Sequence, residues 1–138
     1  MKLVILLQIA AVLHGGLVCA GATMPRAVQL RQNLQSLPVF VRRLFWVYYG
    51  FIGFLLVSLG VLTWVYAGAM AAGLPVARGL SLFMALFWLM RLGAAAFLLD
   101  VRPYLTTPLY RLGNHALNLV FIYLAVLYSW TAWEAGML

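Results

Sequence analysis

Among the polar residues inside stretches that are otherwise apolar, five are the side chains with which the chain could do chemistry. They are His14, Arg91, Asn114, His115 and Asn118. A guanidinium at the centre of a bilayer costs at least about 2.5–3.5 kcal/mol unless it is paired, hydrated or able to reach the membrane surface. We therefore expect Arg91 to point into a helix bundle, where neighbouring helices supply polar groups.

The spacing of these residues allows a polar cluster at one depth. Arg111, His115 and Asn118 follow each other at intervals that place them on one face of a helix. One interpretation is structural: the asparagines hydrogen-bond between helices, and Arg91 rests on the Trp88 ring one turn earlier. A second interpretation is a ligand site for an anionic or quinone-like group. Its residues would be Arg91, Asn114, His115 and Asn118.

A third interpretation is a b-type haem held by His14 and His115, because membrane haems in helical bundles are ligated by histidines on different helices. The protein would then be a haem- or quinone-binding redox protein. Metal-dependent catalysis is disfavoured, since the two acidic residues, Asp100 and Glu134, are expected on opposite sides of the membrane. We assign no catalytic residue and no metal site, and expect no cofactor besides this haem alternative.

The composition requires a membrane. Of 138 residues, 67% are hydrophobic and only 8% are charged, which lies far outside the range of soluble domains. Four apolar segments are each long enough to span a bilayer. They cover about residues 3–23, 44–70, 79–100 and 108–134. The sequence therefore predicts an all-α integral membrane four-helix bundle that forms a single domain, residues 1–138.

The positive charges set the orientation of this bundle. Six arginines fall on one side, in the two loops or at the start of the fourth span, namely Arg26, Arg31, Arg42, Arg43, Arg102 and Arg111. Only Lys2 and Arg78 fall on the other side. Because positively charged loops stay in the cytoplasm, both termini are expected outside, in a multi-pass protein of a bacterial inner membrane. Nucleic-acid binding is disfavoured despite the net charge of +7, since no soluble segment is long enough for a binding fold.

The first apolar segment has a rival interpretation as a secretory signal peptide. Lys2 supplies a basic start, and Ala20-Gly21-Ala22 is similar to a cleavage site. Cleavage would leave the following arginines outside, so we favour an uncleaved helix.

The loop after this segment is expected to contact the membrane surface. Residues 26–37 combine a leucine repeat with arginines, which predicts a short amphipathic cytoplasmic segment. Its arginines and those just after it would bind anionic lipid headgroups at about 1 kcal/mol each. These lipid-headgroup residues are Arg26, Arg31, Arg42 and Arg43.

Small residues and aromatic residues predict how the helices pack and where they meet water. One small-residue face in the first span comprises Ala11, Gly15, Cys19 and Ala22. Another in the second span comprises Gly53, Gly60 and Ala67. Such faces let helices approach closely. Aromatic belts are expected at Trp46 on the inner side and at Tyr128, Trp130 and Trp133 on the outer side.

Several short runs resemble an uncharacterised family of small bacterial four-helix integral membrane proteins. These runs are Met24-Pro25-Arg26, residues 42–48, and residues 87–92 followed by Phe97 and Asp100. The resemblance implies a four-span inner-membrane topology and no known activity. The first span also resembles that of the small haem-binding protoporphyrinogen oxidases of bacterial membranes, in which a histidine is followed by a glycine and then by Pro-Arg at the inner end. The corresponding residues here are His14, Gly21, Pro25 and Arg26. That resemblance implies only His14 as a haem ligand, because Lys2 is the single lysine and the family's intramembrane lysine has no counterpart.

From these patterns we predict a non-catalytic accessory, assembly or lipid-binding subunit. Its expected partners are membrane lipids, and either other membrane subunits or further copies of the chain. The redox protein described above is the alternative.

Overall fold

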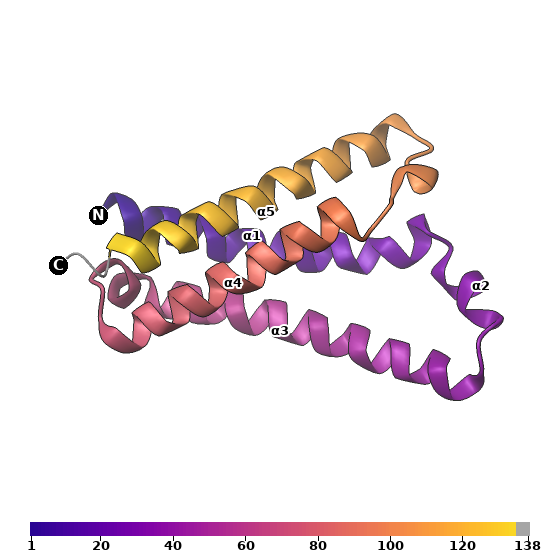
Figure 1. Ribbon diagram of the computed structural model, residues 1–138, viewed down its shortest axis with the longest axis horizontal. Helices are drawn as coiled ribbons and strands as arrows, with labels where there is room; N and C mark the ends of the chain where they lie inside the picture. Colours follow the sequence, from indigo (N-terminus) through magenta and orange to yellow (C-terminus); the bar gives the residue numbers. More distant parts are fainter. Residues whose placement is uncertain (135–138) are drawn as a thin grey trace.

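The computed structural model describes residues 1–134 and shows four long helices joined by short connections (Figure 1). The long helices are α1 (Lys2–Ala27), α3 (Val39–Ala71), α4 (Pro75–Phe97) and α5 (Pro108–Glu134). A short helix, α2 (Leu30–Gln35), follows α1, and a single 3-10 turn, η1 (Arg102–Tyr104), precedes α5. Each long helix is apolar enough to cross a membrane. The prediction of an all-α four-helix membrane bundle is confirmed.

Prolines set several helix boundaries, which differ slightly from those predicted. α3 and α4 begin earlier than expected, at Val39 directly after Pro38 and at Pro75 itself, where a fixed φ suits the first turn. α1 continues through Pro25 to Ala27. α4 ends at Phe97 instead of residue 100, and Asp100 then accepts a hydrogen bond from the backbone N–H of Arg102 at 3.1 Å.

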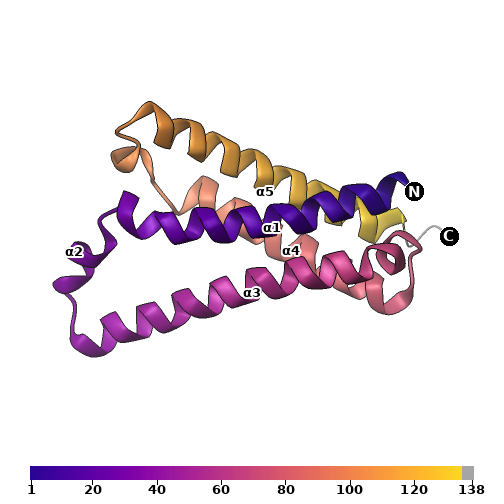
Figure 2. The same ribbon diagram turned by 180° about the vertical axis from the view of Figure 1, so that it is seen from behind.

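The four helices form two antiparallel pairs that converge at one end. α1 packs along α3, and α4 packs along α5. Both views show the pairs close together where α1 begins and α5 ends, and apart where α2 and η1 lie (Figures 1 and 2). We call these two parts the convergent half and the splayed half. The start of α1 and the end of α5 thus lie at the same end of the bundle, while the side of the membrane that they face stays a prediction.

The buried core lies almost entirely in the convergent half. Each long helix contributes side chains with no exposed surface, among them Leu7, Met70, Met84 and Leu124. The apolar side chains of the splayed half, such as Phe51 and Phe54 on α3, are largely exposed. In a membrane these side chains meet lipid, so tight packing in the convergent half must hold the bundle together.

The small-residue face predicted on α3 is confirmed where the helices are close. A Cβ at Gly60 would lie 2.9 Å from the His14 Cβ and 3.3 Å from the Ala11 carbonyl oxygen, so only glycine permits this approach. Ala67 is likewise buried. Gly53 meets nothing within 4 Å, because α1 and α3 have separated at its level.

The small-residue face predicted on α1 is wrong beyond Ala11. Gly15, Cys19 and Ala22 are exposed. α1 instead turns its larger side chains inward, and these include Leu7, His14 and Leu17.

Candidate functional site

His14 lies at the centre of the bundle, with no exposed surface. Its Nδ1 lies 2.7 Å from the Ala10 carbonyl oxygen, and because a carbonyl only accepts, Nδ1 carries the proton. In the neutral ring Nε2 is then an acceptor, and it has no partner among the described residues. The imidazole meets the Trp88 ring edge to face at a centroid distance of 5.3 Å, and the Tyr128 ring at 6.2 Å.

A hydroxyl pair beside His14 links α3 to α5. Thr63 donates its proton to the Leu59 carbonyl at 2.8 Å, so the Tyr128 hydroxyl must donate to Thr63 Oγ1, also at 2.8 Å. Both side chains are fully buried. Tyr128 therefore does not belong to the outer aromatic belt as predicted. Tyr128 lies about 9 Å by helical rise before the end of α5, and this distance could have indicated that it lies below the membrane surface.

Arg91 contacts an aromatic ring, but not the predicted one. Its Cζ lies 4.8 Å from the centroid of the Phe121 ring, and Phe121 in turn stacks on Trp88 at 5.7 Å. Trp88 is unavailable to the guanidinium because its ring already lies between Phe121 and His14. A cation–π contact contributes about 0.5–2 kcal/mol, which offsets only part of the cost of a membrane-buried guanidinium.

Two nitrogen donors near this contact lack acceptors in the described part of the chain. They are Nη1 of Arg91 and Nε1 of Trp88, and both atoms are buried. The prediction that Arg91 turns toward the bundle agrees with its contact to Phe121. The expected polar companion on a neighbouring helix is not seen within residues 1–134, where Nη1 has no hydrogen-bond partner.

The remaining residues of the predicted ligand site lie along the first half of α5. Trp88 on α4 lies beside Phe121 on α5, and the two helices are antiparallel. One turn from this pair toward the splayed end, α4 has Arg91 and α5 has Asn118, so these two residues are at the same level. Asn114 and Asn118 are partly buried, whereas His115 is exposed. The structure therefore brings Arg91 and Asn118 to one level and leaves His115 at the surface of the splayed half.

The two histidines do not fit a shared haem in this arrangement. The α5 side chain that meets the His14 ring is Tyr128, and His115 lies 13 residues earlier on α5 with its side chain exposed. The His14 ring contacts Trp88 on its other side and has no exposed surface. The structure therefore does not bring the two histidines together.

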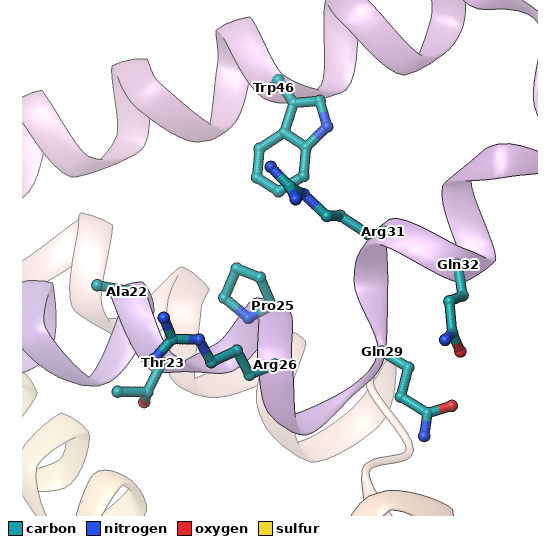
Figure 3. A pocket seen from close by; sticks show the side chains of 8 residues that line it. All are labelled: Ala22, Thr23, Pro25, Arg26, Gln29, Arg31, Gln32 and Trp46. Atoms are coloured by element: carbon teal, nitrogen blue, oxygen red, sulfur yellow. The ribbon is translucent and has the colours of Figure 1, made fainter.

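A groove opens at the end of the splayed half, between the end of α1, the helix α2 and the start of α3. Its volume is about 780 Å³. Its lining residues include Pro25, Arg26, Gln29, Arg31, Gln32 and Trp46. The side chain of Arg31 extends to the Trp46 ring, and that of Arg26 lies beside Thr23 (Figure 3).

A bend between α1 and α2 borders this groove. Gln29 adopts a left-handed conformation with φ of 49°, and α2 then leads from the end of α1 toward the start of α3 (Figure 1). The side-chain amide of Asn33 donates to the Val28 carbonyl at 2.9 Å and holds the bend. On the side of the bundle core, the Tyr49 hydroxyl donates to the Gly21 carbonyl and closes the gap between α1 and α3.

The groove carries positive charge without an acidic side chain among its lining residues. Of the four arginines predicted to bind headgroups, Arg26 and Arg31 line it, whereas Arg42 and Arg43 lie at the start of α3 outside it. The sequence pattern missed Gln29 and Gln32, and predicted Trp46 only as part of an aromatic belt. Guanidinium and amide groups beside an interfacial tryptophan are suited to a phosphate-bearing headgroup.

No family model matches this chain, and no curated protein or solved structure matches it either. The features that indicate its function are therefore the groove and the surroundings of Arg91.

Proposed function

We propose that the protein is a non-catalytic multi-pass membrane protein that binds anionic lipid headgroups at the splayed end of its bundle. The observation that carries this proposal is the groove, where Arg26 and Arg31 share one hollow with Trp46 and no acidic side chain lines it. The arginine-rich end would face the cytoplasm of a bacterial cell, where the inner leaflet supplies such headgroups.

The groove allows a lipid to be held by more than its charge. Arg26 and Arg31 come from different helices, so one phosphate between them would receive hydrogen bonds from two directions. Gln29 and Gln32 add amide donors and acceptors to the lining of the groove. A glycerol headgroup offers hydroxyls that these amides can bind, so we expect phosphatidylglycerol to be preferred to phosphatidylcholine.

The test compares two double variants with the same loss of charge. Arg26→Gln with Arg31→Gln removes the groove arginines, and Arg42→Gln with Arg43→Gln removes two at the same end outside it. Every arginine near the surface adds a diffuse attraction of about 1 kcal/mol, and the two groove arginines would in addition contact the phosphate directly, so the groove variant should lower phosphatidylglycerol binding more than the control variant does. The measurement is native mass spectrometry of protein released from mixed vesicles. Equal losses in both double variants would show a diffuse charge effect and overturn the proposal.

The same purification addresses an accessory or assembly role. A second membrane chain that remains bound to the protein in mild detergent would support that role, and lipid alone would support a lipid-binding module. The two roles are compatible, because a bound headgroup at a helix junction can stabilise a subunit contact.

A further inference from the structure

Arg91 points away from the nearer end of its helix. Its backbone lies about 9 Å by helical rise from the end of α4 at Phe97, which is in the splayed half. Long cationic side chains near a helix end ordinarily reach toward the closer membrane surface. Helical side chains instead tilt toward the helix N-terminus, and for α4 that direction leads to the convergent half. The contact with Phe121, which is level with Trp88, shows that the guanidinium follows this tilt.

The chain has no acidic side chain that could pair with this cation at its depth. Its only two acidic residues are Asp100 and Glu134. Asp100 lies in the exposed loop beside Arg102, with 3.8 Å between the charged atoms, and Glu134 ends α5 at the opposite end of the bundle. The Phe121 ring offsets part of the cost, but a ring cannot accept the proton of Nη1 as an anion does. Within residues 1–134 no side chain supplies a counter-charge, which leaves Nη1 available to a bound anion.

The groups around Arg91 show which chemistry that molecule needs. Trp88 lies one turn earlier on the same face of α4, and its buried indole N–H has no acceptor in the part of the chain that the structure describes. Asn118 is level with Arg91 on α5 and adds a side-chain amide. Guanidinium, indole and amide donors together favour an anionic oxygen group.

We propose that Arg91, with Trp88 and Asn118, binds the carboxylate of a long-chain carboxylic acid whose alkyl chain stays in the bilayer. The depth of the site favours this class over a phospholipid, because a phosphodiester keeps its charge and stays at the headgroup level. A carboxyl group can enter the apolar region in its neutral form and then ionise beside the cation. Arg91 is partly exposed although its Nη1 is buried, so a ligand in the membrane would approach the guanidinium from its exposed side. This site is separate from the groove, which is formed by α1, α2 and α3.

The test uses the full chain in phosphatidylcholine nanodiscs, with palmitate as the probe and hexadecanol as its neutral match. We expect palmitate to bind at least about tenfold more tightly than hexadecanol, since a hydrogen bond to a charged group contributes more than one to a neutral group. Arg91→Gln should abolish this preference. Arg91→Lys should retain part of it, and Arg111→Gln, which removes an exposed cation from α5, should leave it unchanged.

Two further variants separate binding from folding. Trp88→Phe keeps an aromatic ring between His14 and Phe121 but removes the indole N–H. It should lower the palmitate preference several-fold, but the lost volume at this fully buried position should also lower the melting temperature. Asn118→Leu, at a partly buried position, removes the amide while keeping the side-chain volume, so it should lower the preference with little change in melting temperature. Wild-type protein that binds both probes equally would overturn the proposal. So would an Arg91→Gln protein that keeps its preference, or palmitate that is displaced equally well by phosphatidylglycerol.

Discussion

The convergent and splayed halves of the bundle use their polar residues in different ways. In the convergent half, the buried hydroxyls of Thr63, Ser81 and Thr131 each donate to a carbonyl one turn earlier, and Tyr128 donates to Thr63. In the splayed half, Arg26 and Arg31 line an open groove with no acidic neighbour in its lining. Arg91, at the boundary, keeps a buried nitrogen without a partner among residues 1–134. Where four helices converge, polar groups stabilise the fold, and where the helices separate, polar groups stay available to a ligand.

The largest effect is expected from filling the closest helix contact. Gly60→Leu would place its Cβ 2.9 Å from His14, so α1 and α3 must separate where the core is tightest. Overpacking of this kind costs about 1–3 kcal/mol. The matched control is Gly53→Leu on the same helix, where nothing lies within 4 Å. Thermal unfolding in detergent should show a clearly lower midpoint for Gly60→Leu alone. Equal midpoints would mean that the two halves do not differ in packing.

A smaller effect is expected from removing the hydroxyl contact between α3 and α5. Tyr128→Phe deletes the proton that Tyr128 donates to Thr63 and leaves the ring in place. Interhelical hydrogen bonds in membrane proteins contribute on average about 0.6 kcal/mol and at most about 1.7 kcal/mol. Tyr66→Phe, at an exposed position on α3, serves as the control and should change stability little.

A double-mutant cycle sharpens this second prediction. Thr63→Val removes the acceptor of the same hydrogen bond, so its effect and that of Tyr128→Phe should not be additive. Additive losses of unfolding free energy would show that the two hydroxyls do not interact in the membrane.

The smallest effect is expected in the splayed half, at the bend between α1 and α2. Gln29 has a φ of 49°, a conformation that glycine adopts more easily than other residues. Gln29→Gly should therefore change the free energy of unfolding by less than about 1 kcal/mol. Gln29→Val should weaken phosphatidylglycerol binding, because a β-branched residue disturbs the backbone that borders the groove. Native mass spectrometry and a melting curve on both variants provide the comparison. Unchanged lipid binding by the Gln29→Val protein would mean that the bend between α1 and α2 does not shape the groove.

Part of the candidate site could be predicted from spacing. Arg26 and Arg31 are close in sequence to the end of the first span, so their position at one membrane surface follows from local charge. Their joint lining of one groove with Trp46 depends on the turn at Gln29, which no local pattern indicated. For the same reason, the spacing could not show that His14 is fully buried and His115 exposed, because the rotation of each helix is a property of the assembled bundle.

The sequence by itself determined the number of long helices, their approximate ends and the charged end of the bundle. These follow from the lengths of apolar runs, from prolines and from arginine positions, all of which are local. Only the tertiary structure decided which face of α1 meets α3, that Arg91 lies over Phe121 and not Trp88, and where a groove opens. The physical reason is that lipid is as apolar as the bundle core. A helix that is apolar all round therefore carries little signal about its rotation, and close packing must decide it.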